Sequence, residues 1–166
     1  AMPTITLTSE DNRLFITQSD PLGRGLVWPQ SFTCRIIYRD NTSEDVDITL
    51  HTTSELLSLD KPIAHIIPNV CGRGYGLFVL PNETAAWMME HIGEVEDDLM
   101  RQSMVTMLNE IYEWRNSETV CDVREWLDFL IDYIPREKNY LIASTLNGYL
   151  TKPMLEVGTA EDEARL

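Results

Sequence analysis

The hydrophobic pattern of this chain changes once, after Leu80, from the spacing of strands to the spacing of helices. Short runs between Thr4 and Leu80 alternate or are rich in β-branched residues, and turn-forming residues separate them. From Pro81 onward, apolar residues recur every three or four positions, as on one face of a helix. We therefore expect an α+β chain, with an antiparallel β-sandwich-like subdomain over residues 3–80 and an antiparallel α-helical subdomain over 81–166.

The first subdomain has about six predicted strands. The tetrapeptide Asp40-Asn41-Thr42-Ser43 is a short turn sequence, so it predicts an antiparallel hairpin between the third and fourth strands. In chain order, the runs are TITLTS, RLFITQ, SFTCRIIYR, EDVDITL, AHIIPN and YGLFVL.

Four helices are predicted in the second subdomain. The first begins at the capping residue Asn82 and breaks at Gly93, and the second runs from about Glu96 to Trp114. The fourth covers roughly Asn139 to Leu150 and is stopped by the segment that ends in Pro153.

The third predicted helix follows Ser117 and ends at Pro135, with Trp126 at the edge of its apolar stripe. The acidic segment 158–166 that ends the chain is either a frayed terminus or a helix separated from its partner. The members of the stripe are Val120, Val123, Leu127, Leu130, Ile131 and Ile134.

The charge of the chain argues against nucleic acid as a partner. The formal net charge is −14, whereas a phosphate-binding surface needs clustered Lys and Arg. Residues 1–80 hold 9 acidic and 6 basic groups and residues 81–166 hold 18 and 7, so the excess lies in the second subdomain. No apolar run is long enough to span a bilayer, and no signal peptide is visible. We expect Ala1, ahead of Met2, to be left from expression and the natural N-terminus to be missing.

The motifs of common catalytic and metal sites are absent from the sequence. There is no HExxH helix and no GxSxG turn, and His51, His65 and His91 are isolated. A site of His91 with Glu94 and Glu96 is conceivable, but charges at a solvated helix end are the favoured interpretation. We predict no catalytic, cofactor-binding or metal-binding residue, although pairs formed only in space stay open.

Several other features are assigned structural roles. We expect Gly72, Gly74 and Gly76 to form a turn or bulge, because the spacing and the downstream helix of a phosphate loop are missing. Arg24 is expected to be exposed in a loop that buries Trp28. The carboxylates of Glu94, Glu96, Asp97 and Asp98 suit a helix start better than a calcium site. The cysteines are expected to be buried or half-buried free thiols, since they are odd in number and widely spaced: Cys34, Cys71 and Cys121.

Residues 3–150 carry an ordered set of motifs that resembles a known family. Gln18 lies in a strand ahead of Trp28-Pro29, Asn69 precedes the run Gly74-Tyr75, and the helical start PNETAAWMMEHIGEVEDDLM follows. The order and spacing resemble the region downstream of the catalytic domain in aminopeptidase N-type (gluzincin) zinc metallopeptidases.

The resemblance implies that residues 3–80 form the β-sandwich-like linking domain and residues 81–166 the first helices of a helical C-terminal cap. The expected partner is then the catalytic domain of the parent polypeptide, which holds the zinc, and peptide substrates are met only indirectly. No zinc ligand or base of that family falls on this chain. We also expect the isolated fragment to form a homodimer through apolar surface on its helices.

Two other functions stay open. The chain could be a stand-alone acidic module that recruits a basic partner. It could also be a small hydrolase whose residues meet only in space, which would require turnover that a chelator or one substitution abolishes.

Overall fold

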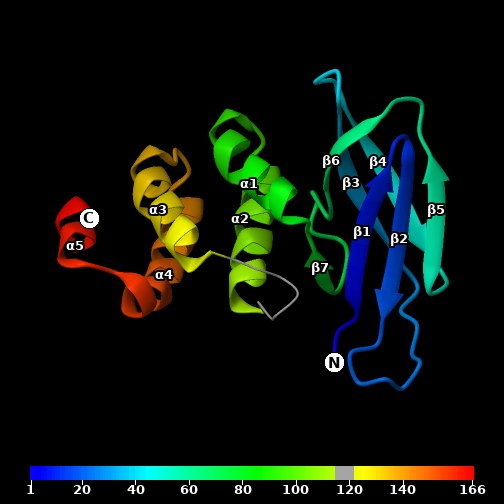
Figure 1. Cartoon of the computed structure of the whole chain (residues 1–166), viewed down its shortest axis with the longest axis horizontal. Helices are drawn as coiled ribbons and strands as arrows, with labels where there is room; N and C mark the ends of the chain where they lie inside the picture. The colour runs from blue at the N-terminus through cyan, green and yellow to red at the C-terminus, as the bar shows by residue number, and fades with distance from the viewer. Residues whose placement is uncertain (115–121) are drawn as a thin grey trace. The chain divides into compact units, whose positions relative to one another are not determined.

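The computed structural model describes residues 1–114 and 122–166, and in these it contains seven strands, five α-helices and two 3₁₀ helices (Figure 1). The α+β class predicted from the sequence is therefore confirmed. The chain divides into two compact units, Ala1–Thr84 and Ala85–Leu166. Within the described residues, no helix combines the length and the apolar composition needed to cross a bilayer.

The first unit consists of two sheets. One has the strand order β5-β2-β1-β7 and the other has the order β4-β3-β6. All pairs are antiparallel except β1 with β7, which run parallel. The strands are β1 (Thr4–Glu10), β2 (Arg13–Ser19), β3 (Gln30–Tyr38), β4 (Ser43–Leu50), β5 (Ser54–Ser58), β6 (Ile63–Ile67) and β7 (Leu77–Val79).

The predicted hairpin between β3 and β4 is confirmed. Asn41 has a positive φ of 64°, a conformation that Asn adopts more readily than most residues. The backbone N–H of Tyr38 donates to the carbonyl of Thr42 at 2.9 Å, and the Asp40 carboxylate accepts from the Thr42 N–H at 3.0 Å. These bonds fix the turn and with it the register of the two strands.

The two sheets of the first unit share one hydrophobic core. Alternate residues of β1 and β2 point into it, and Phe32 of β3 meets Phe78 of β7 edge to face at 5.1 Å. That the two sheets form a β-sandwich stays a prediction. The core consists of Ile5, Leu7, Leu14, Ile16, Phe32, Cys34, Ile36, Tyr38, Ile48, Leu50, Ile63, Ile66 and Phe78.

Strand β5 was not among the strands predicted from the sequence. Its sequence SELLS is short, and Leu56 at its centre is exposed. Because β5 lies at the edge of its sheet, it buries little apolar surface, and the strand pattern is correspondingly weak.

The second unit consists of helices whose starts are set by polar caps. Asp97, Asp122 and Asn139 each accept hydrogen bonds from the first backbone N–H groups of the helix that follows. Gly93 lies in a 3₁₀ turn after α1, so the predicted break there is confirmed. The elements are α1 (Asn82–His91, which begins in the first unit), η1 (Ile92–Glu94), α2 (Asp98–Glu113), α3 (Val123–Tyr133), η2 (Ile134–Arg136), α4 (Tyr140–Val157) and α5 (Ala160–Arg165).

A row of stacked aromatic rings lies in the core of this unit. Trp126 stacks on Phe129 with ring centroids 5.4 Å apart, and Phe129 stacks on Tyr133 at 5.3 Å. Trp126 is buried within this row and not at the edge of an apolar stripe, because Phe129 and Tyr133 are buried as well. The ring of Tyr112 of α2 lies 6.5 Å from that of Trp126. The predicted start after Ser117 and the stripe residue Val120 lie outside the described residues.

The predicted end of the fourth helix at Leu150 is wrong, because α4 continues through Pro153 to Val157. Proline removes one backbone donor and costs a helix interior about 3 kcal/mol. The α2 helix supports α4 on both sides of that position, since Lys152 pairs with Glu113 and the Tyr112 hydroxyl donates to Glu156 at 2.7 Å. Pro153 itself is buried, which offsets part of its cost.

The acidic end of the chain is not frayed, because it folds into the helix α5. Thr159 and Asp162 form a capping box that starts α5. Asp162 is also buried against Arg124 of α3, with both carboxylate oxygens 2.7 Å from guanidinium nitrogens. The paired charge holds α5 to α3.

Candidate functional site

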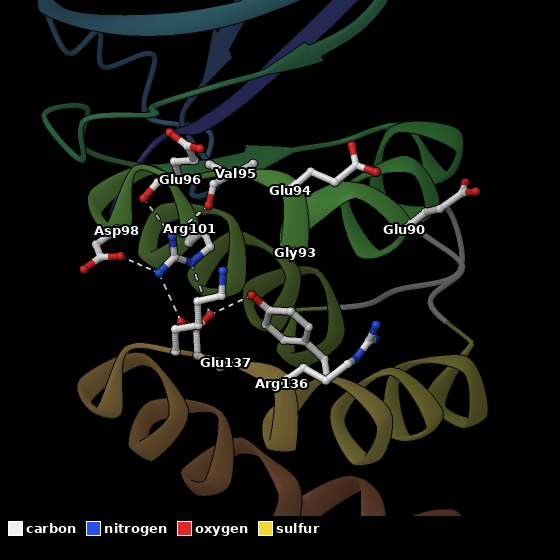
Figure 2. Close-up of a pocket in the computed structure, with 11 residues that line it drawn as sticks. Glu90, Gly93, Glu94, Val95, Glu96, Asp98, Arg101, Arg136 and Glu137 are labelled. Carbon is white, nitrogen blue, oxygen red and sulfur yellow. Dashed lines mark hydrogen bonds and ion pairs between the residues drawn. The ribbon is translucent and has the colours of Figure 1, made fainter.

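The second unit contains a cavity of about 740 Å³ between the start of α2 and the end of α3 (Figure 2). Its walls come from α1, η1, α2, α3, η2 and the segment before α4. Five carboxylates and three cationic side chains line it, so it is a highly charged concave surface. The lining residues are Glu90, Gly93, Glu94, Val95, Glu96, Asp98, Arg101, Tyr133, Arg136, Glu137 and Lys138.

Arg101 lies at the centre of this cavity and uses every donor of its guanidinium group. Its Nε donates to Glu137 at 3.2 Å, and one Nη donates to the carbonyls of Val95 and Glu96 at 2.7 and 3.0 Å. The other Nη binds Asp98 and the second oxygen of Glu137 (Figure 2). An arginine has five N–H donors, and all five are used here. Arg101 therefore has no donor left for a ligand.

Glu137 is saturated in the same way. Besides the two bonds from Arg101, it accepts the Tyr133 hydroxyl at 2.6 Å and the Asn139 backbone N–H at 2.8 Å. Its side chain is only 1% exposed. Burial alone would raise its pKa, but the bonds from Arg101, Tyr133 and Asn139 outweigh burial, so the pKa of Glu137 lies below its usual value.

Tyr133 is unsuited to proton transfer at neutral pH. Burial and the hydrogen bond to Glu137 both raise the pKa of its hydroxyl above the usual value. The hydroxyl thus stays protonated and serves as a donor to the carboxylate. At the centre of the cavity, these paired and hydrogen-bonded side chains join α2 to the segment that follows η2.

The rim of the cavity is different in character. Glu90, Glu94 and Glu96 are exposed, and in Figure 2 the side chains of Glu90 and Glu94 extend away from the Arg101 network. Arg136 donates to the Asp132 carbonyl at 2.9 Å and lies over the Tyr133 ring. The exposed carboxylates of the rim favour cationic groups.

The conceivable metal site at His91, Glu94 and Glu96 does not assemble. The ring of His91 stacks on Trp87 at 4.4 Å, and its Nδ1 lies 2.9 Å from the Trp87 carbonyl, to which it donates. Within residues 1–114 and 122–166, no group of three or more His, Cys, Asp or Glu side chains could hold a metal ion. His65 lies 3.4 Å from the Thr84 hydroxyl, and His51 is exposed.

The glycine-rich segment is a turn, as predicted, and its amides are bound within the protein. The Gly74 N–H donates to the side-chain oxygen of Asn69 at 2.7 Å, and the Tyr75 N–H donates to Gln30 at 2.8 Å. Gly76 has a φ of 149°, and a Cβ there would lie 2.8 Å from the Pro3 carbonyl. These two amides cannot cradle a phosphate, because other groups already accept from them.

The loop around Arg24 is held from within. Asp20 accepts from the backbone of Leu22 and Arg24 and from the Arg24 side chain, with distances of 2.9 to 3.1 Å. The bonds from Arg24 hold the pKa of Asp20 well below its usual value. Trp28 is half-buried and not buried, as its loop lies on the surface.

Two of the three cysteines lie in the described residues. Cys34 and Cys71 are both free thiols, as predicted. Cys34 is buried, as predicted, and burial raises the pKa of its thiol to about 12, so this thiol is inert. The predicted burial is wrong for Cys71, which is exposed in the glycine-rich turn. Cys121 lies outside the described residues.

The Arg101–Glu137 pair was not predicted from the sequence. The two residues are 36 positions apart, so no local pattern connects them. One feature of the sequence indicated that Arg101 would form ion pairs. It is the first basic residue in a strongly acidic helix start, where a single cation has many carboxylates nearby. The carboxylates of Glu94, Glu96 and Asp98 were noted, but not the arginine that organises this segment.

Comparison with known proteins does not assign a family. No protein-family model matches this chain, and no curated protein matches its sequence. The likeness to aminopeptidase N-type enzymes therefore stays a prediction based on the motifs within residues 3–150.

Proposed function

We propose that this chain is a noncatalytic section of a zinc-dependent aminopeptidase of the aminopeptidase N type. Residues 3–80 would link the catalytic domain to a helical cap, and residues 81–166 would be the first helices of that cap. The role is positioning, because a cap limits how a peptide and water reach a catalytic centre. Hydrolysis would belong to the parent's catalytic domain.

The observation that carries this proposal is the structural role of the residues on which the resemblance rests. Gln18 is buried, accepts from the Trp28 N–H at 2.9 Å and donates to the Thr52 carbonyl at 2.7 Å. Asn69 both donates to and accepts from the backbone of Gly74. These side chains brace loops, which suits a rigid connecting unit.

The second unit supports the same role. Its central charges, Arg101 and Glu137, are bound to each other and to neighbouring backbone groups.

The experiment that tests the proposal measures the size of the natural polypeptide. An antibody raised against the 19.1 kDa chain is used on a denaturing gel of the source cells. A much larger polypeptide that holds zinc and removes amino-terminal residues is the expected result. A polypeptide of the fragment's own mass would overturn the proposal.

A second candidate is an acidic module that binds a basic partner, and the rim of the cavity favours it. Glu90, Glu94 and Glu96 present exposed carboxylates close to one another in the chain. A Lys-rich peptide should then bind with an affinity that falls steeply with added salt. The triple change of these residues to Gln should abolish binding, while Glu161→Gln and Glu163→Gln in α5 should not.

A further inference from the structure

The tip of the β3–β4 hairpin carries a sequence at which asparagine side chains are modified. Asn41-Thr42-Ser43 matches the pattern Asn-x-Ser/Thr, in which an oligosaccharide is joined to the asparagine and the middle residue is not proline. All three residues are exposed. Because a pattern of three residues is common by chance, the structure around it has to show whether it can serve as an acceptor site.

The fold makes no use of the Asn41 side chain. The turn is fixed by its backbone and by the Asp40 carboxylate, which accepts from the Thr42 N–H at 3.0 Å. Lys61 supports Asp40 with an ion pair of 2.9 Å. Among the described residues, the side-chain amide of Asn41 and the hydroxyl of Ser43 form no hydrogen bond with another protein group. A substituent on Asn41 Nδ2 therefore breaks no bond of the hairpin.

The conformation of the turn explains only half of the pattern. Asn41 has a φ of 64°, and asparagine is one of the few residues besides glycine that adopt this conformation readily. An asparagine at the tip is thus expected for structural reasons alone. Ser43 opens β4 opposite Ile37 with its side chain exposed, and nothing in the turn or the strand requires a hydroxyl there. The hydroxyl is the second group that the acceptor pattern requires.

The second match to the pattern is less accessible in the folded chain. Asn82 and Glu83 are exposed at the start of α1, but Thr84 is only 3% exposed. The Thr84 hydroxyl lies 3.4 Å from Nδ1 of His65. An enzyme that recognises the hydroxyl together with the asparagine can therefore reach both groups at residues 41–43 and only the asparagine at residues 82–84.

A sugar chain at the hairpin tip would also protect an exposed sheet edge. β4 is the outer strand in the order β4-β3-β6, so one side of its backbone has no partner strand among the described residues. Such an edge can pair with a strand of another chain, and proteins block this by charging or covering the edge. Asn41 is two residues before β4, so a hydrated oligosaccharide there would lie beside this edge.

We propose that Asn41 is an acceptor for an N-linked oligosaccharide. The Nδ2 atom of Asn41 forms a bond to the anomeric carbon of an oligosaccharide carried on a lipid pyrophosphate. The bond from that carbon to the phosphate oxygen breaks, and the lipid pyrophosphate leaves with the electron pair, while the amide gives up one proton to a base of the transferase. The natural polypeptide then passes through a compartment that contains this transferase and its lipid-linked donor. The inference does not depend on the proposed parent enzyme.

The first test is made on the natural polypeptide from the source cells. It is treated, in water labelled with heavy oxygen, with an amidase that removes N-linked oligosaccharides and converts the asparagine to aspartate. Mass spectrometry of the tryptic peptide that begins after Arg39 should then show an aspartate with heavy oxygen at position 41. A sample without the amidase is the control for spontaneous deamidation.

The second test identifies the residues that the modification needs. The chain is expressed behind a secretion signal in eukaryotic cells, and a shift in mass that the amidase removes is expected on a denaturing gel. Asn41→Gln and Ser43→Ala should each abolish this shift, whereas Ser43→Thr should keep it, because threonine supplies the same hydroxyl. Asn82→Gln is the matched control and should leave the shift unchanged, since it alters the other match to the pattern.

Three outcomes would overturn the proposal. The first is a natural polypeptide in which Asn41 is still an asparagine after amidase treatment. The second is a secreted chain that shows no shift in mass. The third is a shift that Asn41→Gln or Ser43→Ala leaves unchanged, since the sugar would then be attached elsewhere, with Asn82 as the other match to the pattern.

Discussion

Replacing Arg101 by Met tests whether the centre of the cavity holds the helical unit together. The side chain of Arg101 is 8% exposed and that of Glu137 is 1% exposed. The change keeps much of the apolar stem but leaves Glu137 without its cation and the carbonyls of Val95 and Glu96 without these donors. Removing one partner of a buried ion pair costs about 3–5 kcal/mol.

That cost is a large share of the stability of the second unit. A unit of its size has a free energy of unfolding of about 4–12 kcal/mol. For domains of this size, each kcal/mol shifts the midpoint of thermal unfolding by about 4–8 °C. We therefore expect Arg101→Met to lower the midpoint of the helical unit at pH 7 by about 12 °C or more. Far-UV circular dichroism during heating, together with urea unfolding, measures the shift.

The loss of stability in Arg101→Met should depend on pH, and the titration of Glu137 determines the direction of this dependence. Its pKa in the folded protein lies below the usual value of 4.5, so it contributes stability above pH 4.5 that is lost as the pH falls through the folded pKa. In the variant, burial acts without the cation and raises the pKa of Glu137, so the folded variant favours the neutral acid. The difference in unfolding free energy between wild type and variant should then be smaller at about pH 4 than at pH 7.

Arg136→Met is the matched control. Arg136 lines the same cavity but is exposed, so its replacement should change stability by about 0.5 kcal/mol or less. The reasoning is refuted if Arg101→Met costs no more than this control at pH 7, or if its cost is as large at pH 4 as at pH 7.

Three further predictions concern other positions. Gly74→Ala should destabilise the β unit by about 1–3 kcal/mol in urea unfolding, because a Cβ would lie 2.7 Å from the Phe78 ring; an unchanged midpoint would contradict this. Asp20→Asn should speed tryptic cleavage after Arg24, since the loop loses its charged acceptor; equal rates of peptide release would argue against such a brace. Asp162→Asn should speed amide hydrogen exchange over residues 160–165, and unchanged protection would mean that α5 is held by other contacts.

Features with a local cause could be predicted from the sequence. The hairpin at residues 40–43 depends on turn-forming side chains, and the break at Gly93 depends on one residue. The change from strands to helices follows from the spacing of apolar residues. Each of these three features is determined by residues that are close together in the sequence, so it can be predicted from the sequence directly.

Features with a distant cause could not be predicted in this way. The continuation of α4 through Pro153 depends on α2, whose Tyr112 and Glu113 bind Glu156 and Lys152. The folding of the acidic end into α5 depends on Arg124, 38 residues before Asp162. Tertiary contacts override local preference in both cases.

The same distinction explains the candidate site. Arg101 to Glu137, Arg124 to Asp162 and Glu113 to Lys152 join residues 36, 38 and 39 positions apart. Each pair joins an earlier helix to a later segment. These ion pairs therefore hold together parts of the second unit that are distant in the sequence. A buried charge that is fully paired resists displacement, because losing one partner exposes the full cost of burying the other. Side chains that are paired like this are unavailable to a substrate. A unit held together by such pairs keeps its shape, which is the property that a positioning role requires.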